Sequence, residues 1–421
     1  MMVFKNCSKK SLWNLSIVGL YIILIYLPDI TRYKNIVMGL IGATALWYLI
    51  RDFKAICKIF KNNLSFSLLF LLLVIGYSIV ISVEPSISIK EINKPILNGL
   101  LLFAVTFPIV LYKEKPTDIA KMVMVAFAIG LLVIMVKDLL LYYFEYKKKD
   151  IWPFTWRSLP SHRDLSYALI FFFPCILSTW FLVKKNKIIN LTLLYIISFL
   201  FIFTILGTLA RGAWVALAIV IIFMIQINHQ WKLLIMGSTV SLLLFISIVH
   251  THFGDKATKT LQYKLSQSDS GLRFSNGTQG SALDLILEHP IKGYGYGNQL
   301  YHNVYNEKVK DYPNWKFKKS IGPHNIFLAF WFAGGILGLF GILYFCSSMI
   351  AQGIQLIRKN HGIIRQASLV LLMSFLGVYV LRGLFENAYI NQVGILVGLM
   401  LALRHALRNN PSATPPPDKQ Q

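Results

Sequence analysis

A succession of long apolar runs, separated by short polar stretches, limits what this sequence can fold into. A helix that crosses the roughly 30 Å hydrocarbon core of a membrane needs about 20 mostly apolar residues, and many of the runs approach that length. The runs lack the alternation of apolar and polar residues that a transmembrane β-barrel requires. Because every backbone group inside lipid must find a hydrogen-bond partner within the protein, the runs are predicted to be α-helices.

The composition supports this interpretation, since 56% of the residues are hydrophobic, only 14% are charged, and the mean hydropathy is +0.58. A soluble domain averages about 25% charged residues. We therefore predict an all-α polytopic membrane protein with about twelve transmembrane helices. The spans are predicted near 12–28, 35–50, 64–83, 96–112, 119–144, 165–183, 188–207, 212–228, 233–252, 324–346, 366–384 and 388–403.

Residues 1–408 are predicted to form one transmembrane helical domain that includes a long loop at 253–323. The basic N-terminal segment has no small-residue cleavage site and is interpreted as an uncleaved first helix. The proline-rich residues 409–421 are predicted to be a disordered cytoplasmic tail. None of the four cysteines falls in a predicted outer loop, so no disulfide framework is expected.

The positions of Lys and Arg predict the orientation, because cytoplasmic loops carry an excess of these residues. Most of those in short loops fall on the side that holds both termini, which is therefore predicted to be cytoplasmic. The long loop 253–323 then faces outward. The outer loops are still basic, which fits either attraction to lipid headgroups or the handling of anionic lipids.

The loop at 253–323 is too long to be a simple connector, and long loops are usually functional. Lys256 to Gln267 is predicted to form an amphipathic helix on the membrane surface. A second helix is predicted from Gly280 to Glu288, ending before a proline. The glycines that follow, in a G-x-G-x-G pattern at 293–297, are interpreted as a turn that lets the backbone approach another element closely.

Two arginines stand out as candidate functional residues. Arg211 lies between apolar stretches with no acid nearby in the sequence, and an arginine at such depth is costly unless it faces a polar cavity or reaches the interface. The adjoining Gly212 and Ala213 are expected to leave room for a ligand. Arg273 follows a glycine in the polar loop and, taken alone, could equally be a solvated charge.

His324 opens the tenth predicted span, just after a proline. The start of a helix disfavours a positive charge, so this histidine is expected to be neutral and able to accept a proton, although it could simply cap the helix. Lower-ranked candidates for substrate contact are Asn325, Arg157, Arg163 and Arg382. Arg382 and Glu386, one turn apart, could also form a structural ion pair.

Other polar stretches carry less functional signal. Glu84, Lys90, Glu91 and Lys94 are interpreted as a solvated outer loop. No D-x-D, H-E-x-x-H or paired-cysteine motif is present, so the carboxylates that a metal-dependent sugar transferase needs are not evident. No metal and no cofactor are therefore expected, and nothing indicates a nucleic-acid partner.

Taken together, three stretches resemble the lipopolysaccharide O-antigen ligase family within the O-antigen ligase/polymerase superfamily. They are Ala210-Arg-Gly-Ala-Trp214, Arg273 with the later Pro290-x-x-Gly-x-Gly-x-Gly297, and Pro323-His-Asn-Ile-Phe-Leu328. The layout of about twelve spans with one large loop late in the chain extends the resemblance over nearly the whole sequence.

The resemblance implies a membrane-embedded, inverting, metal-independent glycosyltransferase in the bacterial inner membrane, with its active site facing the periplasm. The donor would be an undecaprenyl-pyrophosphate-linked polysaccharide, and the acceptor the outer-core sugar of lipid A–core. Arg211 and Arg273 would grip the pyrophosphate, and His324 would act as the base.

Two other functions remain open at this stage. A polymerase of the same superfamily would use a second lipid-linked repeat as acceptor. A transporter or flippase of lipid-linked oligosaccharides belongs to a different class, and would be expected to show internal repeats and charges near the bilayer midplane.

Overall fold

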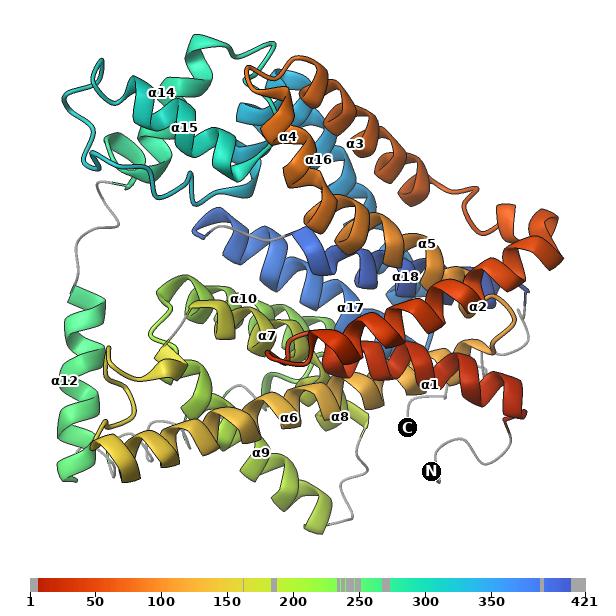
Figure 1. The fold of residues 1–421 in the computed structure, drawn as a ribbon. Helices are drawn as coiled ribbons and strands as arrows, with labels where there is room; N and C mark the ends of the chain where they lie inside the picture. The colour runs from red at the N-terminus through yellow and green to blue at the C-terminus, as the bar shows by residue number, and fades with distance from the viewer. Residues whose placement is uncertain are drawn as a thin grey trace.

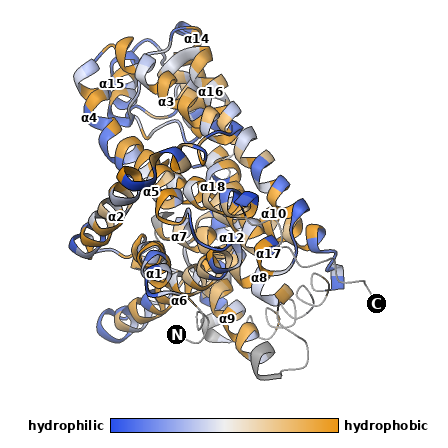
Figure 2. Cartoon of the chain, turned by 90° about the vertical axis from the view of Figure 1, so that its right-hand side faces the viewer, coloured by the Kyte–Doolittle hydropathy of each residue, from blue (hydrophilic) through white to orange (hydrophobic). Residues whose placement is uncertain are grey.

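The computed structural model of the chain describes residues 7–161, 163–182, 188–232, 251–266, 273–386 and 390–409, together with residues 235, 239 and 246. All regular elements in these ranges are helical, as predicted (Figure 1). Eight helices of the described part are long and apolar enough to cross a membrane. Figure 2 shows apolar residues over most of the helices and hydrophilic ones at many loops and helix ends. The chain is thus a multi-pass membrane protein.

The N-terminal half contains helices that correspond to the first eight predicted spans. Their bounds are α1 (Lys9–Leu24), α2 (Thr31–Cys57), α3 (Asn63–Val80), α4 (Pro85–Ile92), η2 (Asn93–Leu101), α5 (Leu102–Val110), α6 (Pro116–Lys149), η3 (Leu159–Ser161), α7 (Arg163–Phe172), α8 (Pro174–Leu182), α9 (Ile188–Gly207) and α10 (Arg211–Asn228).

The C-terminal half contains the long loop and the last three spans. Its elements are α12 (His252–Ser266), α14 (Thr278–Glu288), α15 (Asn298–Lys308), α16 (Ile326–Lys359), α17 (Gly362–Phe375), η4 (Leu376–Leu381), η5 (Arg382–Leu384), η6 (Ile390–Gln392) and α18 (Val393–Asn409). The predicted span 233–252 and the predicted tail fall almost entirely outside the described residues.

One prediction is wrong. The stretch 84–94 is helical and not a loop, because α4, the π-helical η2 and α5 form a continuous helical segment from Pro85 to Val110. Its residues Lys90 and Lys94 are exposed, as predicted. Pro85 occupies the first turn, where its missing N–H is not needed and its fixed φ favours a helix. Two acidic residues of this stretch contact the long loop, since Glu84 accepts a hydrogen bond from Asn303 and Glu91 accepts one from the backbone N–H of Gln299.

Loops predicted to share a side of the membrane lie together in the structure. At one end, the end of α2, the α5–α6 turn and the end of α18 line a common shallow pocket. At the other end, Val83 donates its backbone N–H to the Tyr294 carbonyl at 3.0 Å, and Asn303 donates to Glu84 at 3.0 Å. The long loop therefore packs on the ends of α3 and α4, as Figure 1 shows.

Residues 278–315 of the long loop have a small hydrophobic core of their own. Its members are Ala282, Leu285, Ile286, Tyr294, Leu300, Tyr301, Val304, Tyr305, Trp315 and, from α16, Phe332. Polar contacts fix the edge of this core, since Glu288 accepts hydrogen bonds from Tyr294 and Tyr312 and forms an ion pair with Lys308. The helix predicted at 280–288 is confirmed, whereas α15 was not predicted.

A break in α16 attaches this unit to the membrane helices. Gly334 and Gly335 leave helical geometry, and Gly335 has φ +59°. The carbonyl of Phe332 accepts the N–H of Tyr294 at 2.8 Å, and that of Ala333 accepts the N–H of Gly295 at 2.9 Å. The glycine-rich turn thus approaches α16 backbone to backbone, as the sequence predicted.

Candidate active site

The site is built on the turn that follows α17. The carbonyl of Arg382 accepts hydrogen bonds from the amides of Phe385 and Glu386, each 3.0 Å long. These bonds close residues 382–386 into a compact turn, called the α17 turn below. The α17 turn presents three acceptors to its surroundings, namely the carbonyls of Leu384 and Phe385 and the carboxylate of Glu386, a residue that is 8% exposed.

Arg273 reaches this turn from the long loop. It lies in a short helical segment ahead of α14, and its side chain is half-buried. Its Nη1 donates a 2.6 Å hydrogen bond to the Phe385 carbonyl, 112 residues away in the sequence. The contact fixes the planar guanidinium at the α17 turn, so Arg273 is more than a solvated loop charge.

His324 meets the same turn from the start of α16. Its Nδ1 lies 3.6 Å from Oε2 of Glu386, and the residue is 8% exposed. The amide of Gln279 donates both to the His324 carbonyl, at 3.2 Å, and to the Leu384 carbonyl, at 2.7 Å. Gln279 therefore ties α14, the segment before α16 and the α17 turn into one unit.

The backbone around His324 is held in an unusual conformation. His324 has φ +47°, a left-handed value that is uncommon for residues other than glycine. The helix itself begins only at Ile326, because Asn325 is its N-cap and accepts the N–H groups of Phe327 and Leu328. His324 thus lies just outside the helix whose first residue it was predicted to be.

Arg211 is the first residue of α10, after a tight turn from α9 in which Leu209 has φ +52°. Its side chain is half-buried. A Cβ on the neighbouring Gly212 would lie 3.4 Å from side-chain atoms of Phe385 and Glu386. The start of α10 therefore packs on the α17 turn. The space expected for a ligand beside Gly212 is instead filled by these two residues.

The lower-ranked arginines lie in different surroundings. Arg382 is 1% exposed, and its guanidinium carbon lies 3.4 Å from the centre of the Tyr167 ring. This favours a structural role in holding the α17 turn. Arg157 is exposed in the loop after α6, where its role stays a prediction. The side chain of Arg163 falls outside the described residues.

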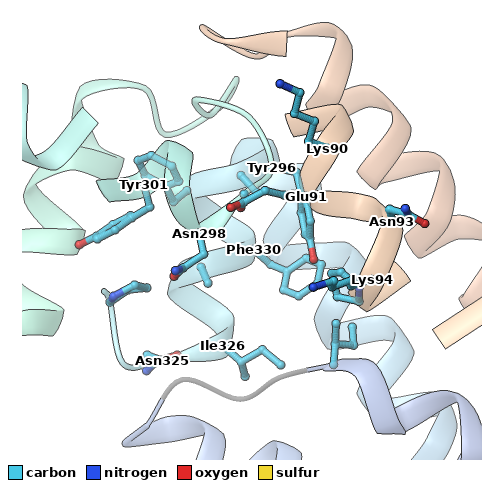
Figure 3. Close-up of a pocket in the computed structure, with 17 residues that line it drawn as sticks. Lys90, Glu91, Asn93, Lys94, Tyr296, Asn298, Tyr301, Asn325, Ile326 and Phe330 are labelled. Atoms are coloured by element: carbon cyan, nitrogen blue, oxygen red, sulfur yellow. The ribbon is translucent and has the colours of Figure 1, made fainter. Parts of the chain in front are cut away.

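A cavity of about 540 Å³ adjoins this cluster between α4, η2 and the start of α16. Its lining includes Pro323 and Asn325, the two neighbours of His324, and Phe330 of α16. Figure 3 shows the side chain of Lys94 directed into this cavity, whereas Lys90 extends away from it at the rim. Burial raises the pKa of Tyr296, so its hydroxyl stays protonated and can donate a hydrogen bond.

Sequence reasoning missed several of these residues. Glu386 was considered only as a partner of Arg382, although its carboxylate lies beside His324. Gln279 carried no signal, because a glutamine in an apolar helix resembles any other. Lys90 and Lys94 are exposed, as predicted, but the cavity that they line was not foreseen. Only their spacing of four residues on a helix indicated that they share a face.

The arrangement suits chemistry on an anion. Arg273, the start of α10 with Arg211, and His324 meet at a turn whose nearby carboxylate is that of Glu386. Guanidinium groups bind phosphate oxygens with two parallel hydrogen bonds. A histidine whose Nδ1 faces a carboxylate can accept a proton at Nε2, although the tautomer is inferred from the contact.

Comparison with known proteins identifies the family. A family model described as O-antigen ligase matches residues 196–343. A curated O-antigen ligase from Salmonella typhimurium (strain LT2) is 40% identical over 397 residues, covering 94% of this chain and 96% of the relative. The chain belongs to the O-antigen ligase family. The matched segment contains Arg211, Arg273 and His324, and the relative extends the similarity over the α17 turn as well.

Proposed function

We propose that the protein is an O-antigen ligase that transfers polysaccharide from undecaprenyl pyrophosphate to the outer-core sugar of lipid A–core, on the periplasmic face of the bacterial inner membrane. The observation that carries this proposal is the meeting of Arg273, His324 and the start of α10 on the α17 turn. Membership in the O-antigen ligase family supports the reaction class.

In the proposed reaction, Arg211 and Arg273 hold the pyrophosphate of the donor. Negative charge builds up on this group as the bond between the anomeric carbon and the phosphate oxygen breaks, and the pyrophosphate leaves with the bonding electrons. Two guanidiniums placed in advance stabilise that charge in the transition state. They supply the role that a divalent cation has in other sugar transferases, so the reaction is proposed to be metal-independent.

His324 is the proposed general base. Its Nδ1 faces Glu386 and its Nε2 takes the proton from the attacking acceptor hydroxyl, whose oxygen forms the new bond to the anomeric carbon. Attack from the face opposite the departing pyrophosphate inverts the anomeric configuration. Glu386 orients the ring in the way that a carboxylate orients the histidine of a hydrolase triad.

Reconstitution tests this function directly. Purified protein in lipid nanodiscs receives lipid-linked polysaccharide and lipid A–core, with EDTA and without nucleotide. We expect polysaccharide-bearing lipid A–core with an inverted glycosidic linkage, and no product from His324→Ala. Loss of the product on chelation, restored by magnesium, would refute metal independence. Elongated lipid-linked chains would identify a polymerase, and movement of donor across vesicle membranes without a new bond would identify a transporter.

A further inference from the structure

The cavity between α4, η2 and α16 is lined by basic and amide side chains that the transfer reaction does not by itself require. In the part of the chain that the structure describes, neither Lys90 nor Lys94 has a hydrogen-bond or ion-pair partner, although both line the cavity. The nearby carboxylate of Glu91 is already engaged, because both of its oxygens accept the backbone N–H of Gln299, at 3.0 and 3.1 Å. Only Lys94 is directed into the cavity, because Lys90 extends away from it at the rim (Figure 3). The cavity therefore offers one inward-facing cation, beside the carboxylate of Glu91.

The remaining lining suits a sugar. Asn298 and Asn325 present amide groups that can donate and accept hydrogen bonds. Tyr296 and Phe330, whose ring centres are 6.2 Å apart, provide aromatic faces for the apolar side of a pyranose ring. A volume of about 540 Å³ lies within the range of small-molecule sites.

The position of the cavity indicates which of the two substrates, donor or acceptor, it would bind. Pro323 and Asn325 line it, while the imidazole between them faces Glu386 on the α17 turn. The cavity thus adjoins the chain segment that carries the proposed base, although His324 itself is not among its lining residues. The acceptor is expected beside that segment. The chemistry also differs, because planar guanidinium groups suit a pyrophosphate, whereas lysines are flexible point charges that suit a single phosphate.

We propose that this cavity is the acceptor subsite and that it recognises a phosphate-bearing sugar through Lys94. The inference rests on the proposed function, which supplies the two substrates. It adds to that function that phosphate groups on the acceptor strengthen the binding of the acceptor to the protein. A phosphate could instead come from the lipid-linked donor, and the experiment separates the two sources.

The test measures acceptor binding without donor, and then transfer kinetics, for two acceptor preparations. One is phosphorylated lipid A–core, and the other is the same material after removal of its phosphates. We expect Lys94→Ala to weaken binding of the phosphorylated acceptor by about 10-fold, the typical effect of losing one charge-assisted hydrogen bond. Lys94→Arg should retain most of the binding. Lys310→Ala is the matched control, because Lys310 is likewise an exposed lysine, lies on the neighbouring loop unit and does not line the cavity.

The dephosphorylated acceptor completes the test. Wild-type protein should bind it about 10-fold more weakly than the phosphorylated form, and Lys94→Ala should cause no further loss. The proposed subsite would be overturned if the lysine variant lost affinity equally for both acceptors, or if its acceptor binding were unchanged. It would also be overturned if the variant bound the donor more weakly instead. Lysine-dependent binding of phosphorylated acceptor without any transfer would refute the proposed function while leaving the subsite intact.

Discussion

At the scale of single residues, the site depends on how His324 is held. A left-handed backbone conformation at a residue other than glycine costs about 1 to 3 kcal/mol and persists only where the surroundings enforce it. Here Gln279 binds the His324 carbonyl, and Asn325 caps the helix that follows. The ring is therefore aimed at Glu386 by backbone contacts, which explains how a loop residue can be placed accurately enough for proton transfer.

The different chemistry assigned to arginine and histidine gives the first prediction. Arg273→Lys keeps the charge but loses the planar fork, so it should reduce transfer nearly as much as Arg273→Ala, by about 100- to 1,000-fold. Arg211 should behave in the same way. His324→Ala should retain donor binding and lose transfer by roughly 100- to 10,000-fold. Donor binding and transfer rate are measured side by side. Loss of donor binding in His324→Ala, with Arg273→Ala unaffected in both, would show that these roles are assigned wrongly.

Glu386 gives a second prediction at this scale. Glu386→Gln should lower the transfer rate at saturating substrates by about 10-fold or more, because the ring loses the carboxylate that orients it, yet less than loss of the base does. KM for both substrates should stay unchanged, and Glu386→Asp should restore part of the rate. Glu114→Gln is the control, since Glu114 is a buried acid that binds Ser11 and Asn14 at the opposite end of the bundle. Unaltered turnover in Glu386→Gln would rule out a positioning role.

At the scale of elements, the decisive feature is the broken helix α16. A continuous helix would have satisfied the carbonyls of Phe332 and Ala333 internally, whereas the break at Gly334–Gly335 frees them for Tyr294 and Gly295. The loop unit is thus joined to the membrane helix by backbone hydrogen bonds. Through Gln279 and Arg273 the same unit reaches the α17 turn, so anchoring the loop also assembles the site.

The stability of the loop unit should depend on pH through Glu288. Burial raises the pKa of this carboxyl, but the hydrogen bonds from Lys308, Tyr294 and Tyr312 outweigh that effect and lower its pKa below the ordinary 4.5. A lowered folded-state pKa stabilises the unit fully above pH 4.5, and the stabilisation is lost as the pH falls through the folded-state pKa. Amide hydrogen exchange over residues 278–308 measures this.

Glu288→Gln should exchange faster than wild type at pH 7, and the difference between the two should vanish at acidic pH, once exchange is corrected for its intrinsic pH dependence. Glu307→Gln, an exposed acid on α15, is the control and should match wild type throughout. A difference between Glu288→Gln and wild type that stays constant down to the lowest pH would contradict the assignment.

The sequence predicted elements better than contacts, for a physical reason. Apolar runs must be helical in lipid whatever their neighbours, so the all-helical class followed from local composition. Eight helices of the described part are long and apolar enough to span a membrane, and the predicted count of twelve stays a prediction. Arg211 could be singled out as a candidate from the sequence, because an arginine at a membrane boundary is costly without a polar surrounding, and its role stays a prediction. The partners of these residues were not predictable. Glu386 meets His324 only through tertiary packing, and Lys94 became a cavity residue because the long loop folds over α4 and η2.

At the scale of the whole molecule, the two ends of the helix bundle carry different structural features. One end holds the loop unit, the α17 turn and the cavity with its lysines. The opposite end holds the α5–α6 turn, where Lys113 pairs with Asp52 at 3.0 Å, and the end of α18. A reaction that joins two lipid-anchored substrates needs the base, the guanidiniums and the acceptor cavity on the same side, and the fold provides this by gathering alternate loops at one end.

The remaining prediction concerns which end faces the periplasm. Because most Lys and Arg of the short loops lie at the end opposite the loop unit, that end is predicted to be cytoplasmic. Cysteines are introduced at Lys310, exposed on the loop unit, and at His361, exposed between α16 and α17, in a background where Cys7 and Cys57 are serine. Cys175 and Cys346 are buried and can remain.

In intact spheroplasts a membrane-impermeant thiol reagent should label Lys310→Cys, and should label His361→Cys only after the membrane is permeabilised. The reverse pattern would place the candidate active site in the cytoplasm, where lipid A–core carrying a finished outer core could not meet a periplasmic polysaccharide donor, and the proposed reaction would fall with it.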